Sequence, residues 1–271
     1  MDKIKNYIIN LLINKKYEII ILISSIIIFI CLIAIDFALN ESQAKISGYV
    51  CNIATEFLGI LITYFVIQRL FNKQNINKEK QEEKTKILRY NEIISLYIDY
   101  YKRYFYCVTT PIDSRDFKNI RFNNDFKLKD MCDLYKLSLL VTTPLYKPAI
   151  ELFYEYERDL RRIFENIIFN IDFKYYKEIQ EVITHFIQLS LMCDVKDAII
   201  SQKNTFIGDK KTIDEVNEML KAEYIEEQYI QYKQNTLISN GATSYFILYD
   251  LMQGECAILN RYEELINKLN S

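Results

Sequence analysis

Two long apolar runs dominate the pattern of hydrophobic and polar residues. Ile19 to Ile35 contains seventeen residues without a charge, and Ile46 to Phe71 is interrupted only by Glu56 before Gln68 and Arg69. About twenty helical residues cross a hydrocarbon core of roughly 30 Å. The pattern predicts two transmembrane helices, over about 18–38 and 46–71, that form a hairpin. A cleaved signal peptide is the alternative for the first run, but no small-x-small cleavage site follows it.

Basic residues flank the two runs unequally. Four lysines precede the first run, six Lys or Arg residues lie between Arg69 and Lys86, and Lys45 is the one basic residue in the turn. Cytoplasmic flanks carry the Lys/Arg excess, so we expect a multi-pass protein of the plasma (inner) membrane with both termini cytoplasmic. Ile4 to Ile13 fits either a short interfacial helix or a loosely ordered N-terminus.

The rest of the chain has a helical pattern. With 5 Gly and 3 Pro in 271 residues, few positions favour a turn. We predict an all-α protein: a membrane region over 1–71, a long helix leaving the membrane over 72–110, and a cytosolic multi-helix bundle over 111–271. The Asn-rich segment 72–77 is a candidate kink in the long helix.

Apolar residues beyond this segment repeat at spacings of three and four, which predicts a heptad-like seam packed along another helix. They are Ile87, Tyr90, Ile94, Tyr97, Tyr101, Tyr104 and Val108. Pro111 should end the helix, and an ordered loop should follow over 112–126.

Further helices are predicted over Leu128–Val141, Pro148 to about Asn170, and Asp172 to about Lys203, with Asp172 as the N-cap of the third. A break at Thr143–Pro144 separates the first two, and a loop around Gly208 follows the third. Thr212 and Glu215 form a capping-box pattern for a helix to about Gln234. Gly241 separates this helix from the last one.

The second run carries a stripe of small and polar residues on one helical face about 100° wide. They are Gly48, Asn52, Thr55, Glu56, Gly59 and Thr63. Such a face meets another helix in lipid, and an intramembrane carboxylate marks a functional site by default. Glu56 either joins the hairpin, through hydrogen bonds to Asn52, Ser24 or Ser25, or it contacts another copy, or it lines an ion path.

The same run resembles a pattern in uncharacterised bacterial membrane proteins with two N-terminal spans and a variable cytosolic helical region. The likeness lies in Asn-Ile-Ala-Thr-Glu-Phe-Leu-Gly-Ile-Leu-Ile-Thr from Asn52 and in Phe-Val-Ile-Gln-Arg-Leu from Phe65. It covers about twenty residues, and Gln68 stands where an acidic residue is common. The resemblance implies the topology and singles out Thr55, Glu56 and Gly59, but it implies no activity.

Catalytic, metal-binding and cofactor-binding patterns are lacking. The six cysteines have no CxxC spacing, and no Gly-rich phosphate loop or zincin motif occurs. His185, the single histidine, is at the edge of an apolar helix face, where packing or solvent contact is the expected role. The pairs Glu155/Glu157 and Glu226/Glu227 are interpreted as solvated faces. We therefore predict no enzyme, no catalytic residue, no metal and no cofactor.

Charge argues against nucleic acid. From Ile87 onward 23 Lys and Arg face 28 Asp and Glu, a net charge of −5, whereas a phosphate-binding surface should be basic. Arg158, Arg161 and Arg162 project from one side of a helix and are a candidate anion contact, for example for a nucleotide ligand. Ion pairs with Glu155, Glu157 and Glu165 are the favoured alternative.

Two functions remain. The first is a homo-oligomeric membrane effector, whose cytosolic domain senses a protein partner or ligand and whose hairpin perturbs the membrane, a layout that suits bacterial stress or phage defence. The second is a membrane-tethered scaffold that docks a cytosolic protein through its heptad-like seam. Membrane lipid is a partner in both. A passive anchor gains nothing from Glu56, so the stripe favours the effector.

Overall fold

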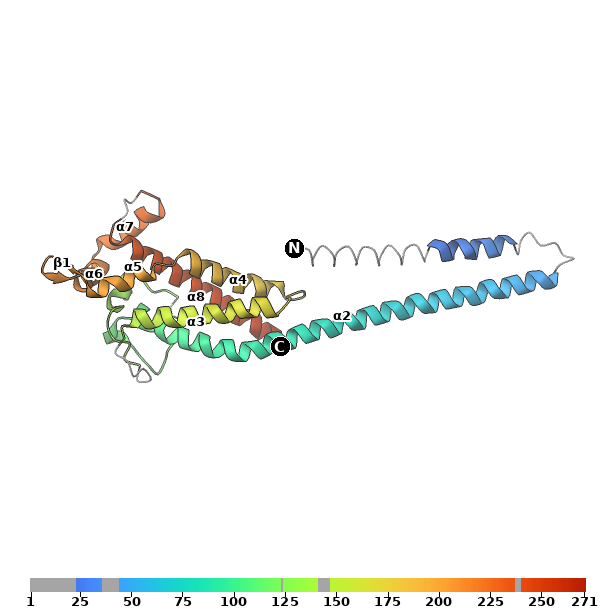
Figure 1. The fold of residues 1–271 in the computed structure, drawn as a ribbon, viewed down its shortest axis with the longest axis horizontal. Helices are drawn as coiled ribbons and strands as arrows, with labels where there is room; N and C mark the ends of the chain where they lie inside the picture. The colour runs from blue at the N-terminus through green and yellow to red at the C-terminus, as the bar shows by residue number, and fades with distance from the viewer. Residues whose placement is uncertain (1–22, 36–43, 123, 141–146, 237–239) are drawn as a thin grey trace. The chain divides into compact units, whose positions relative to one another are not determined.

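The computed structural model is mostly helical, which confirms the all-α prediction (Figure 1). It describes residues 23–35, 44–122, 124–140, 147–236 and 240–271, with backbone only at 44–47, 50 and 51. The helices are Ile23–Ile35, α2 (Ala44–Thr109), α3 (Ala149–Asn170), α4 (Lys177–Met192), α5 (Lys196–Ser201), α6 (Thr212–Lys221), α7 (Tyr224–Lys233) and α8 (Thr243–Asn270). Three 3₁₀ turns, η2 (Ile112–Ser114), η3 (Leu128–Asp133) and η4 (Gln202–Asn204), and two strands, β1 (Phe206–Ile207) and β2 (Lys210–Lys211), complete the described elements. The predicted interfacial helix 4–13 and the break at Thr143–Pro144 lie outside the described residues.

The chain divides into two compact units, Met1–Glu79 and Lys80–Ser271, and α2 contributes residues to both. This helix is 66 residues long and stays helical through the Asn-rich segment 72–77. No Gly or Pro follows Gly59 before Pro111, so nothing in the backbone interrupts the helix. It ends at Thr109, as the proline predicts.

The first unit exposes its apolar side chains. Within Asn52–Thr109 lies the one described helix that is long and apolar enough to cross a membrane, and 6% of its apolar window is buried. Ile23–Ile35 is apolar but shorter, and the rest of the predicted first span, 18–22 and 36–38, lies outside the described residues. Ser25 and Ala54 are the buried residues described in this unit. The described part of the molecule therefore contains one candidate span.

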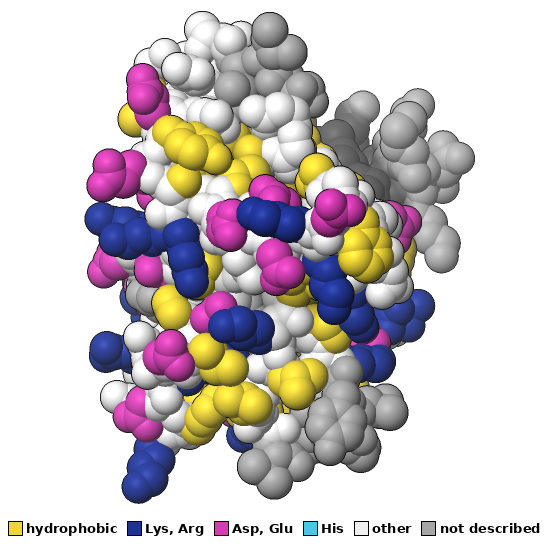
Figure 2. Space-filling view, turned by 90° about the vertical axis from the view of Figure 1, so that its left-hand side faces the viewer, with side chains coloured by type: hydrophobic (Ala, Val, Ile, Leu, Met, Phe, Trp, Pro, Cys, Tyr) yellow, Lys and Arg dark blue, Asp and Glu magenta, His cyan; other side chains and the backbone are white. Residues whose placement is uncertain are grey.

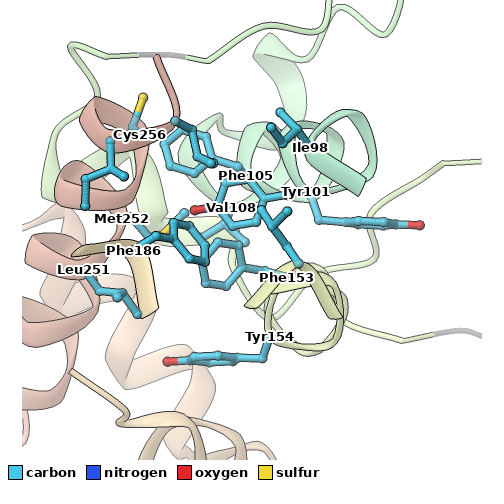
Figure 3. Packing of buried hydrophobic residues seen from close by; sticks show 14 of the residues in the cluster. Ile98, Tyr101, Phe105, Val108, Phe153, Tyr154, Phe186, Leu251, Met252 and Cys256 are labelled. Atoms are coloured by element: carbon cyan, nitrogen blue, oxygen red, sulfur yellow. The ribbon is translucent and has the colours of Figure 1, made fainter. Parts of the chain in front are cut away.

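The second unit is a bundle with an aromatic core, in which Phe105, Phe153 and Phe186 gather between helices (Figure 3). Tyr101 of α2 is fully buried, with its ring 5.4 Å from that of Phe153 on α3 and 6.4 Å from that of Phe186 on α4. The predicted seam is buried or half-buried at every position, so it does pack along other helices. This packing is the unit's own core.

Helix α8 closes the bundle against α4. Gly254 lies so near α4 that a Cβ at this position would be 2.5 Å from Cδ2 of Leu189. Glycine permits this approach because it has no side chain. Residues of α8 also reach α2: Tyr262 Oη donates to Asn91 Oδ1 at 3.0 Å, and Lys102 Nζ lies 2.5 Å from Glu263 Oε1.

The prediction of one helix over Leu128–Val141 was wrong. Only the 3₁₀ turn η3 forms, after which Leu134 O and Lys136 O accept hydrogen bonds from Ile150 N at 3.0 Å and Ala149 N at 2.9 Å. Leu137 forms a bridge with Pro148. Long-range pairing with the start of α3 therefore replaces the local helical bonds, and tertiary contacts override propensity.

The helix predicted from Asp172 to Lys203 is divided. Asp172 is exposed, α4 begins at Lys177 with Tyr176 as its N-cap, and residues 193–195 separate α4 from α5. β1 and β2, with two residues each, pair as an antiparallel hairpin around Gly208, so the segment after η4 is not purely a loop. The φ of Gly208 is 60°, a backbone conformation that favours glycine.

The predicted Thr212 capping box is absent. Lys211 is the N-cap of α6, without a side-chain capping bond, and the Thr212 hydroxyl accepts a hydrogen bond from Thr205 Oγ1 at 2.8 Å. The predicted continuous helix to Gln234 is two helices, α6 and α7. The predicted helix end near Gln234 and the start of the last helix after Gly241 agree with the structure, because α7 ends at Lys233 and α8 begins just after Gly241.

Candidate functional site

The polar stripe of α2 lies on the surface of this single chain. Its six residues, Gly48, Asn52, Thr55, Glu56, Gly59 and Thr63, are all exposed. The Thr63 hydroxyl donates to its own helix, at Gly59 O, over 2.8 Å. No described residue forms a hydrogen bond or ion pair with the Glu56 carboxylate, so Asn52, Ser24 and Ser25 do not bind it here. The stripe is therefore available to a neighbouring molecule.

The three arginines of α3 have different surroundings. Arg161 reaches α4, where its Nη1 donates to Ser190 Oγ at 3.1 Å, and its Nε lies 3.8 Å from Glu165 Oε1. Arg158 Nε is 3.7 Å from Asp159 Oδ1, and Arg162 is exposed. The pairing of Arg161 with Glu165 follows the ion-pair alternative, whereas Glu155 pairs with Lys147 instead.

A buried polar cluster lies between α2, α3, α4 and α8. The Ser190 hydroxyl donates to the carboxylate of Glu157, and Tyr101 Oη donates to Glu255 Oε2 at 2.6 Å. Glu157 is nearly buried and Glu255 is completely buried. The interpretation of Glu157 as part of a solvated face was wrong, because it lies on the same face of α3 as Phe153 and Leu160.

Both carboxyl groups of this cluster have pKa values above their ordinary range. Burial, followed by the nearby Glu157 carboxylate, raises the pKa of Glu255 well above its ordinary value. Burial also raises the pKa of Glu157, against the Ser190 hydrogen bond and Arg161. Glu255 Oε1 and Tyr154 Oη, both buried, have no hydrogen-bond partner. Because Glu255 is closed to solvent, the cluster joins helices in this conformation and offers no open catalytic carboxylate.

The sequence does contain a signal for this cluster. Glu157 is four residues after Phe153 and three before Leu160, and Glu255 is four residues after Leu251 and four before Leu259. A carboxylate at a core position of an amphipathic helix predicts a buried partner. The four helices that provide the partners are identifiable only in the folded chain.

A second buried network contains tyrosines. Tyr135 Oη donates to Ile199 O at 2.8 Å, and its oxygen lies 2.7 Å from that of Tyr245, which in turn donates to Gln202 Oε1 at 2.6 Å. Burial raises the pKa of Tyr135 to about 12, against the hydrogen bond with Tyr245. Burial raises the pKa of Tyr245 as well, so both hydroxyls keep their protons and connect the segment after η3 with α5, η4 and α8.

The cavities among the described residues of the second unit include two larger ones, and a smaller one of about 240 Å³ beside Tyr106 and Arg121. One of the two larger cavities, of about 470 Å³, is lined by the turn before α4, the start of α4 and the end of α8. The other, of about 760 Å³, lies among η4, β1, α6 and α7, and Phe206, Ile207 and Tyr224 on its rim are more than half exposed.

Figure 2 shows that hydrophobic side chains and charges of both signs are interspersed on one end of the molecule, without a large basic patch there.

The remaining candidates have ordinary surroundings. His185 is exposed, and the five cysteines whose side chains are described are free thiols. Within the described residues, no group of three or more His, Cys, Asp or Glu side chains is arranged to hold a metal ion. No protein-family model, curated protein or solved structure matches the chain.

Proposed function

We propose that this chain is a multi-pass inner-membrane effector with cytoplasmic termini, in which a cytosolic helical bundle senses a protein partner or ligand and a two-span hairpin oligomerises and perturbs the membrane. The exposed polar stripe on α2 carries this proposal. Bacterial stress or phage defence is the setting that this layout suits.

The apolar surface of the first unit supports insertion into lipid. Ile60, Ile62 and Leu70 are each more than half exposed, and the described helix around them is long and apolar enough to contain a span. Burying such side chains is worth about 25 cal/mol per Å² of apolar surface. A bilayer supplies that burial, and the basic flanks of both runs orient the hairpin.

The stripe supports self-association within the membrane. Lipid exposure of a carboxylate at the centre of a span costs at least about 2.5 kcal/mol, so the exposed Glu56 needs a polar neighbour. Gly59 and Gly48 permit close helix approach, and Thr63 and Asn52 supply polar side chains. Copies assembled around this face place a ring of Glu56 carboxylates along the axis, which favours the passage of cations.

The passive scaffold is the alternative. It relies on the heptad-like seam as a docking surface, yet Ile87, Ile94 and Tyr101 are buried by the bundle's own helices. A partner therefore has no access to the seam in this conformation. This observation favours the effector over a scaffold that uses the seam.

The decisive experiment measures membrane potential and dye uptake in cells that express wild type, Glu56→Gln or the control Glu181→Gln at equal levels. Glu181 is an exposed carboxylate on α4, so its substitution removes the same charge outside the stripe. We expect depolarisation by wild type and Glu181→Gln and its loss in Glu56→Gln.

Crosslinking in membranes provides the second readout. Wild type should form oligomers, and Glu56→Gln should form fewer. Equal depolarisation by Glu56→Gln refutes the role of the stripe. A wild type that is both silent and monomeric refutes the effector and leaves the anchored scaffold.

A further inference from the structure

The cavity at the start of α4 has a basic rim. Lys174, Lys177 and Lys268 line it, and all three are exposed. The one carboxylate in its lining, Glu178, lies 3.6 Å from Arg261 Nη2, which offsets its charge. The rim of the cavity therefore carries three lysines and one lining carboxylate that is itself close to an arginine.

Two backbone donors of the turn beside this cavity are already occupied. Glu83 of α2 is nearly buried, and its carboxylate accepts hydrogen bonds from Tyr175 N and Tyr176 N at 3.1 Å. Glu83 thus holds the turn before α4, from which Lys174 and Lys177 line the cavity. Lys80, on the same helix as Glu83, lies 5.9 Å from the centre of the Tyr176 ring, so its positive charge accompanies the Glu83 carboxylate at this turn.

The interior of the cavity is apolar. Ile179 of α4 and Leu265 and Leu269 of α8 line it, together with the half-buried rings of Tyr175 and Tyr176. Its volume of about 470 Å³ is within the range of small-molecule sites, roughly 300–1,000 Å³. A ligand that fits must combine a negative charge for the lysines with an apolar or glycerol-like part for the interior.

We propose that this cavity binds the head group of an anionic glycerophospholipid. The lysines contact the phosphate, the tyrosine hydroxyls contact the polar head group, and Ile179 with Leu265 contacts the start of the acyl chains. Free phosphate has no part that matches the apolar lining, so the amphiphilic character of the site favours lipid. The inference rests on the membrane location proposed above, but not on ion passage or on Glu56.

The experiment uses the full chain in uncharged detergent micelles and native mass spectrometry to count bound ligands. The probes are dihexanoyl phosphatidylglycerol, dihexanoyl phosphatidylcholine and inorganic phosphate. The test variant is Lys174→Gln/Lys177→Gln/Lys268→Gln. The matched control is Lys118→Gln/Lys129→Gln/Lys211→Gln, which removes the same charge at exposed lysines outside the cavity.

We expect phosphatidylglycerol to bind wild type and the control with equal affinity and the test variant at least about tenfold more weakly, since each lysine near a lipid head group contributes about 1 kcal/mol. Circular dichroism melting verifies that the variants fold. The variant Leu265→Gln, which polarises the interior and keeps every lysine, should weaken phosphatidylglycerol binding and leave phosphate binding unchanged.

Three results overturn the inference. They are equal binding of the two phospholipids by wild type, unchanged binding by the triple variant, and phosphate binding as tight as that of phosphatidylglycerol, which identifies a free-anion site instead. Membrane fractionation separates this failure from that of the proposed function. A chain absent from the membrane fraction refutes the membrane location itself, whereas a membrane-resident chain without lipid selectivity refutes only the lipid site.

Discussion

The two parts of α2 have similar side chains and opposite surroundings. In the first unit Ile60 is 67% exposed, whereas in the second Ile94 is 1% exposed, although both are isoleucines of one continuous helix. Around Ile94 the apolar residues repeat at spacings of three and four and meet α3, α4 and α8. Around Ile60 the apolar residues surround the helix except along the polar stripe.

This difference shows that apolar content does not decide burial by itself. A helix with one apolar face directs that face toward its own chain, whereas a helix that is apolar on most sides has more surface than a single chain covers. In the proposed function lipid or further copies cover the first part, whereas the apolar seam of the second part is covered by the bundle itself. The contrast can be tested by substitution.

The largest effect is expected in the buried core. Phe153→Ala removes a completely buried ring from the contact with Tyr101 and should lower the free energy of unfolding of the bundle by about 3–5 kcal/mol. Ile60→Ala, at an exposed site in the first unit, should change it by less than about 0.5 kcal/mol. Denaturant unfolding of the full chain in micelles, followed by circular dichroism, measures both. Equal effects would contradict the contrast between the two parts of α2.

A smaller effect is expected from the buried carboxyl group. The pKa of Glu255 is raised by burial, so its neutral form stabilises the fold at low pH, and this contribution declines as the pH rises from the ordinary pKa of about 4.3 towards the raised value. Glu255→Gln keeps an acceptor for Tyr101 but does not ionise, so the variant should melt at an increasingly higher temperature than wild type as the pH rises from 5 to 8.

Glu56→Gln is the comparison for Glu255→Gln, because Glu56 is exposed on the first part of α2. The melting temperature of the bundle should be the same for Glu56→Gln and wild type throughout this pH range. A difference between wild type and Glu255→Gln that does not depend on pH would exclude ionisation of Glu255 as its cause.

The smallest effect separates two arginines of α3. Arg161→Gln removes the hydrogen bond to Ser190 and should lower the free energy of unfolding by about 1 kcal/mol. Arg162→Gln, at an exposed side chain, should change it by less than about 0.5 kcal/mol. Urea unfolding of both variants in parallel tests this order. An equal loss in the two would indicate that Arg162 also supports the fold.

The sequence predicted the elements that depend on local signals. The end of α2 before Pro111, the end of α3 at Asn170 and the start of α8 after Gly241 follow from prolines, glycines and periodicity. It failed for Leu128–Val141, where an apolar pattern fits a helix but the backbone bonds to the start of α3. Such pairing joins distant residues, and periodicity carries no information about it.

The candidate sites also differ in whether they depend on one helix or on contacts between distant residues. The stripe with Glu56 and the arginine cluster were identified from spacing on single helices, because residues three and four apart share a face. The roles of Glu157 and Glu255 and the basic cavity at α4 were missed. Each depends on side chains from two or more helices, and Glu157 and Glu155 look alike in the sequence although one is buried and the other pairs with Lys147.

The sequence by itself determined the all-α class, the apolar runs, the polar stripe and the seam of α2, because each is a property of neighbouring residues on one helix. Only the tertiary structure decided which carboxylates are buried, which lysines share a cavity with Leu265 and Leu269, and which apolar surfaces remain open. Burial and pKa depend on what surrounds a side chain, and the surroundings of Glu255 come from residues as distant in sequence as Tyr101.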